Sequence, residues 1–197
     1  MALVKPLGEE EFAPEVLELA QFFKKTLGGI PNSVRTMIRR PAIAKAFTQL
    51  NMAVMECHGQ LTPELKRLIG YMTSLTAGCR YCQAHTALAA KRFGSTDERL
   101  HDLWTYRGSE HFSDAEKAAF DFAIAASSVP NGVTPEIEAA LKEHWDDDDI
   151  VEILGVIALF GYLNRWNDSM GTTLEELPTE VGQNYLADSG WEVGKHT

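Results

Sequence analysis

The sequence has few basic side chains and no long uncharged apolar run. Its apolar stretches fall short of the roughly 18 residues that a membrane-spanning helix needs, and residues 1–6 lack the apolar core of a secretory signal. The 28 acidic side chains outnumber the 18 basic ones and give a formal charge of −10, which opposes attraction to phosphate backbones and anionic lipid. We therefore expect a cytoplasmic protein whose partners include neither nucleic acid nor a membrane.

Cysteine is scarce as well, and the motifs of several enzyme classes are missing. Three cysteines are too few, and odd in number, for a disulfide scaffold. The sequence contains no GxGxxG, P-loop or GxSxG motif, so no motif supports a nucleotide-dependent enzyme or a serine hydrolase. We predict no bound cofactor, and any reducing power has to come from a partner protein or a small thiol.

The alternating pattern of a β-strand is nearly absent, whereas helix signals recur throughout the chain. This predicts an all-α, single-domain fold of eight or nine helices, and 197 residues with 45% apolar content suffice for one sizeable core. The expected helices cover about residues 14–27, 31–39, 41–57, 63–77, 79–93, 97–106, 113–127, 135–145 and 150–163.

Local signals mark several helix ends. Thr62 and Pro63 are typical of a helix start, and Gly78 is typical of a stop. The acidic run at 146–149 precedes an apolar helix, so we interpret it as N-terminal capping rather than as a metal site. From residue 172 the chain becomes polar and richer in glycine, which predicts an irregular tail over 172–197 that wraps over the surface or another subunit.

The segment that carries chemistry is 78–86, with the sequence Gly-Cys-Arg-Tyr-Cys-Gln-Ala-His-Thr. Two thiols three residues apart at a helix start can close a small disulfide ring, and the helix N–H groups with Arg80 nearby favour the thiolate. His85 lies about 60° around the helix axis from Cys82 and about 120° from Cys79, so it serves Cys82 better as a proton partner. The helix dipole acts more strongly on Cys79, which is nearer the helix end. These arguments leave the attacking cysteine open.

Two other interpretations of the cysteines compete with redox chemistry. Both could be buried small apolar side chains, although a pair beside Arg, Tyr, Gln and His is unusual for that role. Cys57, Cys79, Cys82 and His85 could also form a zinc site of three thiolates and one imidazole. Against zinc, a second close ligand pair is missing, and Cys57 ends a different helix, where we expect it to be buried.

Residues 78–87 closely resemble the active-site signature of AhpD-like proteins, the alkylhydroperoxidase branch of the carboxymuconolactone decarboxylase family, and in particular its peroxidase-related members. The resemblance extends to Ile-Pro-Asn at 30–32 and to Asn-Arg-Trp-Asn-Asp at 164–168. It implies an AhpD-like helical bundle over residues 30–171, with 1–29 as a helical extension and 172–197 as the tail. It also implies a homo-oligomer.

The resemblance further implies a thiol-dependent peroxidase that reduces a hydroperoxide through a dithiol–disulfide cycle. In that family the second cysteine attacks the peroxide, the first resolves the sulfenic acid, and a Glu–His pair relays protons. Carried over, Cys82 is peroxidatic, Cys79 is resolving and His85 is the relay base. The sequence departs from the pattern at two positions, because the family histidine usually stands where Thr86 is and its glutamate where Arg67 is.

Glu64 is the carboxylate we select for the relay. It lies one helical turn before Arg67, and residues three apart share a helix face, so it could bridge to His85. An acid at this first-turn position is equally well explained by the helix dipole. Glu152 is the next candidate carboxylate if Glu64 does not serve.

Two further functions remain open at this stage. The decarboxylases of the family lack the cysteine pair, so a carboxymuconolactone decarboxylase-like activity is the runner-up to peroxidase activity. The third hypothesis is a non-catalytic thiol redox switch, which would use the same disulfide without turnover.

Overall fold

The computed structural model describes residues 2–197, and within that range it consists of helices and connecting segments without a strand. The prediction of an all-α fold is confirmed, and the described range has ten α-helices because one more forms in the expected tail. None of these helices combines the length and apolar character that a membrane span requires. They are α1 (Leu17–Leu27), α2 (Asn32–Met37), α3 (Pro41–Met55), α4 (Pro63–Thr76), α5 (Arg80–Arg92), α6 (Asp97–His101), α7 (Asp114–Ser127), α8 (Pro135–His144), α9 (Asp147–Met170) and α10 (Glu176–Val181).

Capping side chains and glycines set several helix ends at the signals that the sequence carries. The Thr62 hydroxyl accepts the N–H of Leu65 at 3.1 Å at the start of α4. Gly78 follows α4 with φ of 72°, a left-handed conformation that glycine adopts without steric cost. The Asp146 carboxylate accepts the N–H of Asp149 at 2.9 Å in the first turn of α9. The capping interpretation of the acidic run is therefore confirmed.

The central helix α9 is longer than the apolar pattern indicated. It was expected over 150–163, but it begins at Asp147 and continues to Met170, where Gly171 ends it with φ of 56°. The additional turns bury two amides, since Asn164 is 3% and Asn167 is 1% exposed. Polar residues interrupt an apolar periodicity, so the pattern alone stopped too early.

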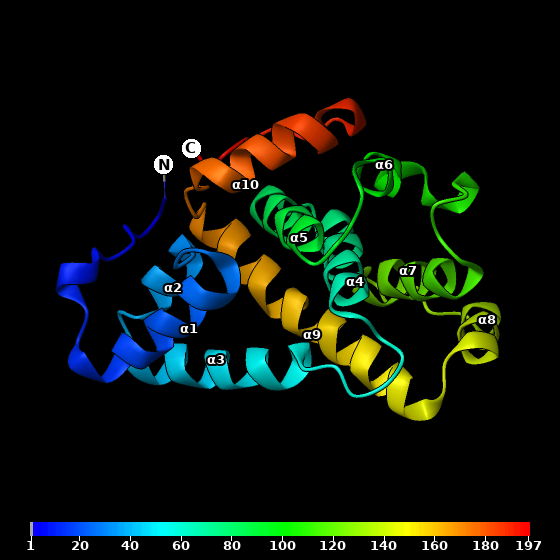
Figure 1. The fold of residues 1–197 in the computed structure, drawn as a ribbon, viewed down its shortest axis with the longest axis horizontal. Coiled ribbons are helices and arrows are strands. Elements are labelled where there is room, and N and C mark those ends of the chain that lie inside the picture. Colours follow the sequence, from blue (N-terminus) through cyan, green and yellow to red (C-terminus); the bar gives the residue numbers. More distant parts are fainter. Residues whose placement is uncertain (1) are drawn as a thin grey trace.

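Two apolar clusters meet along α9. The helix crosses the middle of the molecule, with α1, α2 and α3 on one side and α4, α5 and α7 on the other (Figure 1). The larger cluster includes Leu68, Phe120 and Ile153, and the smaller one joins Phe23 and Phe47 to Leu159 of α9. The helix of the expected N-terminal extension is thus part of the packed structure and lies against the centre of the fold.

The C-terminal segment is ordered, so the prediction of an irregular tail is wrong over much of its length. It forms α10, which packs against α5 (Figure 1), then a π-helical turn at Gly182–Leu186 and a 3₁₀ turn at Ala187–Ser189. Leu186, Trp191 and His196 are at most 5% exposed. The Trp191 indole N–H donates to the carbonyl of Arg80 at 3.1 Å. Widely spaced apolar side chains hold this polar segment against α5.

Candidate active site at the cysteine pair

Both cysteines lie at the start of α5, where Gly78 reverses the chain after α4. Cys79 is the N-cap residue, and its sulfur accepts the N–H of Cys82 at 3.5 Å. Both thiols are free, and Cys79 is 0% and Cys82 3% exposed. The first turn of one helix therefore holds two reduced thiols together, away from bulk water.

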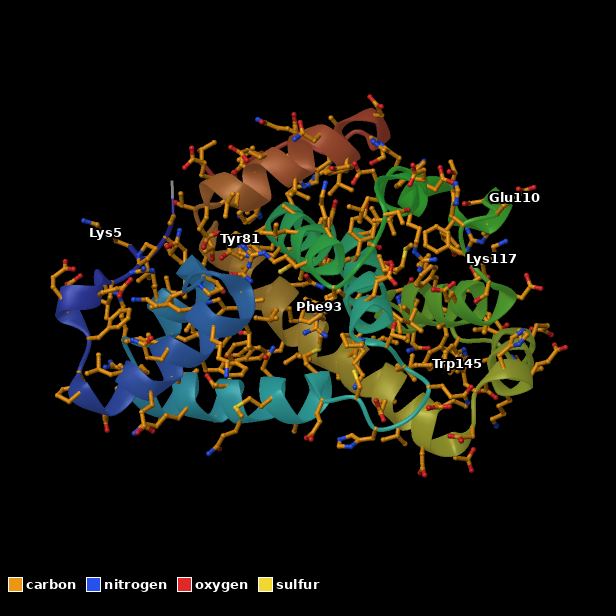
Figure 2. The ribbon with its side chains drawn as sticks, in the orientation of Figure 1. Lys5, Tyr81, Phe93, Glu110, Lys117 and Trp145 are labelled. Carbon is orange, nitrogen blue, oxygen red and sulfur yellow. The ribbon has the colours of Figure 1, made fainter. Side chains whose placement is uncertain are left out.

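A pocket of about 440 Å³ opens onto one of these thiols. Cys82 and His85 line it, whereas Cys79 does not. Figure 2 shows two of its lining residues, Tyr81 and Phe93, in the middle of the molecule beside the N-terminal helices. The apolar lining joins residues of both clusters to two exposed side chains, Met52 and Phe93. The lining residues that belong to the clusters are Phe22, Phe23, Leu27, Val34, Phe47, Met55, Phe160 and Leu163. A cavity of this kind suits an apolar organic ligand presented to Cys82.

His85 is paired with a carboxylate from the C-terminal segment. The Nε2 atom of His85 lies 2.6 Å from Oε2 of Glu175. The other carboxylate oxygen of Glu175 accepts the Tyr81 hydroxyl at 2.9 Å and also the backbone N–H of Asn32. The Tyr81 hydroxyl in turn accepts the N–H of Ser33 at 3.3 Å. Three separate parts of the chain thus fix the orientation of this pair.

The environment keeps the Glu175 carboxylate ionised. Burial would raise its pKa, but the charge and hydrogen bond of His85 and the N–H of Asn32 outweigh burial, so the pKa lies below the ordinary value. An ionised carboxylate against the imidazole orients the ring and stabilises the imidazolium that forms when the ring takes a proton. When the ring is neutral, it can therefore accept a proton from a thiol in the same pocket, with the carboxylate stabilising the charge that forms.

The Cys82 thiol is held in its protonated form. Burial raises its pKa well above the ordinary range, and the neighbouring Cys79 adds to that effect. The side-chain amide of Asn167 donates to the Cys82 sulfur at 3.3 Å and acts in the opposite direction. The expectation that the helix end and Arg80 favour the thiolate is wrong for Cys82, because burial dominates. Attack by this sulfur requires a base.

The structure does not bring Glu64 to His85, so the prediction of a Glu64–His85 bridge is wrong. The Glu64 carboxylate accepts the Nε–H of Arg99 at 2.8 Å and a neighbouring serine hydroxyl at 2.6 Å. The first turn of α4 borders α6, which supplies that arginine. The second candidate, Glu152, is paired with the buried Lys66 at 2.7 Å. Neither carboxylate reaches the cysteine pair.

Arg67 stands where the family usually has its glutamate, and it lines the same pocket as Cys82. Its guanidinium carbon lies 4.2 Å from the centroid of the Phe93 ring. Burial lowers the pKa of Arg67 to about 10, so it remains a cation at neutral pH. The pocket wall thus carries a positive group at this position.

Cys57 is exposed, which corrects its assignment as a buried helix residue. The helix α3 ends at Met55, and Cys57 lies in the connection that follows. In contrast, Cys79 and Cys82 are buried at the start of α5. The structure therefore does not bring Cys57 into a shell with the other two thiols and His85.

Sequence reasoning missed three groups that touch the reactive residues: Glu175, Tyr81 and Asn167. Glu175 is separated from His85 by ninety positions and lies in the segment taken as an irregular tail. No periodicity or spacing connects residues so far apart, because the contact arises from packing of the C-terminal segment on α5. Tyr81 and Asn167 lie within the segments 78–87 and 164–168, which carry the family resemblance. Their polar side chains in these segments were the signal that could have indicated a hydrogen-bonding role.

Comparison with known proteins finds a family and two similar proteins over part of the chain. The model of the carboxymuconolactone decarboxylase family matches residues 41–125, which include the cysteine pair. The uncharacterized protein YnjA of Escherichia coli (strain K12) is 31% identical over 111 residues, 56% of this chain and 60% of that protein. The uncharacterized protein YdfG of Bacillus subtilis (strain 168) is 28% identical over 108 residues, 54% of this chain and 73% of that protein.

Solved structures extend the similarity to nearly the whole chain. The debrominase Bmp8 without ligand is 30% identical, with a TM-score of 0.86 over 93% of this chain and 97% of that chain. A variant of Bmp8 in complex with 2,3,4-tribromopyrrole is 29% identical, with a TM-score of 0.87 over 94% of this chain and 98% of that chain. An AhpD-core, peroxidase-related protein from Ralstonia eutropha JMP134 is 21% identical and shares the fold. Its TM-score is 0.80 over 90% of this chain and 94% of that chain. The chain belongs to the carboxymuconolactone decarboxylase family and has its AhpD-like fold.

Proposed function

We propose that this protein is a thiol-dependent peroxidase that reduces an apolar organic hydroperoxide with the Cys79–Cys82 dithiol. The observation that carries the proposal is the placement of the buried Cys82 thiol in an apolar pocket together with the His85–Glu175 pair. Cys79 lies beside it but outside the pocket lining. Substrate therefore meets Cys82 first, and Cys79 is available for the second step.

The first step transfers one oxygen atom to sulfur. The Cys82 thiol gives its proton to His85, and the thiolate attacks the terminal peroxide oxygen, so that an S–O bond forms and the O–O bond breaks. The imidazolium, stabilised by Glu175, returns the proton to the departing alkoxide, which leaves as an alcohol. Sulfur is oxidised to sulfenic acid and the peroxide is reduced. The amide of Asn167, 3.3 Å from this sulfur, stabilises its anionic form.

The second step closes the disulfide. The Cys79 sulfur attacks the sulfenic sulfur of Cys82, the S–O bond breaks, and the hydroxide takes a proton and leaves as water. An external thiol or a protein reductant then restores the dithiol. This cycle uses two electrons and needs no bound cofactor.

A second candidate function is reductive debromination of an aromatic ring. Two observations favour it: similarity to the debrominase Bmp8 at 29–30% identity, and the many phenylalanines around the pocket. In this reaction Cys82 takes the bromine while the ring carbon takes a proton, and Cys79 then displaces bromide to give the same disulfide. Both candidates therefore use the same dithiol and differ in the bond that breaks.

Steady-state turnover separates the candidates. Reduced protein is supplied with dithiothreitol and either cumene hydroperoxide or 2,3,4-tribromopyrrole, and peroxide loss or bromide release is measured. We expect many equivalents of peroxide to be consumed by wild type and none by Cys82→Ser. Bromide release without peroxide consumption would favour the second candidate.

The same assay tests the other hypotheses for the family. A non-catalytic redox switch would consume one equivalent of peroxide per chain and then stop, because its disulfide would not be reduced by dithiothreitol on the time scale of the assay. A decarboxylase-like activity needs no dithiol, so its carbon dioxide release would survive the Cys79→Ser/Cys82→Ser double substitution. Turnover that depends on both cysteines contradicts both of these alternatives.

A further inference from the structure

A second histidine lies against the cysteine pair, outside the pocket lining. His196 is 1% exposed, and its ring nitrogen, the Cys79 sulfur and a carboxylate oxygen of Asp168 lie within 4.8 Å of one another. Backbone hydrogen bonds fix this end of the chain, because the His196 carbonyl accepts the N–H of Leu174 at 2.8 Å and its N–H donates to Val193 at 3.2 Å. The imidazole is therefore held in one place.

The tautomer of His196 follows from its partners. Its Nδ1 atom lies 2.9 Å from the carbonyl oxygen of Thr172, which can only accept, so Nδ1 carries the proton. The Nε2 atom then has a free lone pair, and it is buried without a hydrogen-bond partner among residues 2–197. A buried acceptor without a partner is rare in native proteins and calls for a functional explanation. The neighbouring group that has a proton to give is the Cys79 thiol.

The charged surroundings suit proton transfer to this nitrogen. Burial is the main cause that lowers the pKa of His196, so the ring is neutral and accepts protons at physiological pH. Oδ1 of Asp168 lies 3.9 Å from Nε2 and faces the imidazolium that protonation creates. Lys195 binds the other oxygen of Asp168 at 2.8 Å and prevents that carboxylate from holding the ring permanently protonated.

We propose that His196 is the acid–base partner of Cys79, as His85 is of Cys82. This inference rests on the proposed dithiol cycle and assigns a residue to its second step. The Cys79 S–H bond breaks with transfer of the proton to Nε2 of His196, and the resulting thiolate forms the S–S bond to the oxidised Cys82 sulfur. The hydroxide that leaves Cys82 takes its proton from solvent and departs as water, because His85 has already returned its proton to the alkoxide in the first step. On reduction of the disulfide, His196 returns the proton to Cys79.

The same three side chains could in principle hold a cation, but the local charge opposes it. The Lys195 ammonium already occupies one oxygen of Asp168, and a metal-bound Cys79 thiolate would be unavailable for disulfide closure. Stoichiometric zinc in the purified, reduced protein, measured by elemental analysis, would overturn the acid–base role.

Disulfide closure driven by diamide tests the proposal without any peroxidase activity. Diamide enters the pocket and forms an adduct with Cys82, and closure then requires only Cys79. Rapid acid quench and peptide mass spectrometry follow both steps and separate them from the adduct on the exposed Cys57. His196→Asn is the variant, because the asparagine amide keeps a donor for Thr172 and removes Nε2. We expect adduct formation at the wild-type rate and closure slowed about a hundredfold, the size of a lost general base. The matched control, His144→Asn on α8, should close as wild type does.

Unchanged closure in a folded His196→Asn protein would overturn the proposal. A second measurement uses wild type alone, so it stands even if the variant does not fold. Long-range proton–nitrogen spectra of the reduced protein should show His196 as the neutral Nδ1–H tautomer, and an Nε2–H tautomer or a permanent imidazolium would contradict the assignment. If peroxide turnover is absent while diamide closure still depends on His196, the proposed function fails and this inference stands.

Discussion

At the scale of single residues, the proposed dithiol chemistry depends on which groups accept the thiol protons of Cys82 and Cys79. The Cys82 thiol is buried, which raises its pKa, and its nearest polar contacts are the Asn167 amide and the Cys79 sulfur. Neither neighbour can take a proton as imidazole can. His85 lines the same pocket and is backed by the ionised Glu175. In the proposed cycle, the reactivity of the Cys82 thiol therefore depends on Glu175, which lies ninety positions beyond His85.

The first prediction concerns this carboxylate. Glu175→Gln keeps the shape and the hydrogen bonds with Tyr81 and Asn32 but removes the charge that stabilises the His85 imidazolium. We expect peroxide turnover to fall by about a hundredfold to a thousandfold, the range of a lost acid–base group. Initial rates with cumene hydroperoxide and dithiothreitol measure the effect.

The matched control applies the same chemical change to Glu64. Because Glu64 is paired with Arg99 at 2.8 Å and does not reach His85, Glu64→Gln should keep turnover near that of wild type. The substitution should instead lower the free energy of unfolding by about 1 to 2 kcal/mol, because it weakens the half-buried, charged hydrogen bond between Glu64 and Arg99. A large loss of turnover in Glu64→Gln with wild-type turnover in Glu175→Gln would reverse the assignment of the relay.

A second prediction at this scale concerns the order in which the thiols react. Iodoacetamide reacts with thiolate, so the exposed Cys57 should be alkylated first, while the buried Cys79 and Cys82 react much more slowly at neutral pH. Mass spectrometry of peptides from the native, reduced protein measures the three rates. Alkylation of Cys82 ahead of Cys57 would contradict the burial of the pair.

At the scale of elements, the turn between α4 and α5 sets the position of both cysteines. Gly78 has φ of 72°, and a Cβ atom built on it meets nothing within 4 Å. Alanine at this position is therefore opposed by the backbone conformation alone. The site depends on this conformation, because it places Cys79 at the N-cap of α5.

Gly78→Ala should lower the free energy of unfolding by about 1 to 2 kcal/mol, the cost of a left-handed residue with a Cβ atom. The control is Gly155→Ala in α9, where the new Cβ would lie 3.8 Å from Val54, an ordinary contact. There we expect a gain of up to about 1 kcal/mol from helix propensity. Equal effects of the two substitutions in urea titrations would contradict the conformational argument.

The elements differ in how far the sequence could predict them. The starts of α4 and α9 carry capping side chains, so local residues were enough. The end of α9 was missed because Asn164 and Asn167 are buried polar residues, which interrupt the apolar pattern that marks a core helix. The helix α10 was missed because six residues among prolines and glycines give no periodic signal.

At the scale of the whole molecule, the candidate site joins three regions that are far apart in sequence. The cysteine motif and His85 could be identified from adjacent residues, and the family resemblance implied the roles that we propose for them. Glu175 and His196 could not, because each reaches the site through packing of the C-terminal segment against α5. The identity of a catalytic motif is thus a local property, whereas its proton partners depend on the complete fold.

The assembly of the molecule is a further prediction at this scale. One face of α9 exposes Val151 at 70%, Leu154 at 48% and Tyr162 at 38%. Large apolar side chains at helical spacing on a surface are typical of contacts between copies of a chain. We expect a homo-oligomer at micromolar concentration, and Leu154→Glu should shift it to monomer in light scattering. The control Leu17→Glu, at a residue that is 48% exposed on α1, should leave the mass unchanged; a monomeric wild type would contradict the prediction.

The central claim is that Cys82 and Cys79 act together as a two-electron reductant for a ligand in the apolar pocket. The most direct measurement is a thiol titration and peptide mass map of the reduced protein before and after one equivalent of cumene hydroperoxide. The account predicts the loss of two thiols, a peptide with a Cys79–Cys82 disulfide, and a Cys57 that still reacts with iodoacetamide. Three titratable thiols after exposure to peroxide, or a disulfide that contains Cys57, would contradict it.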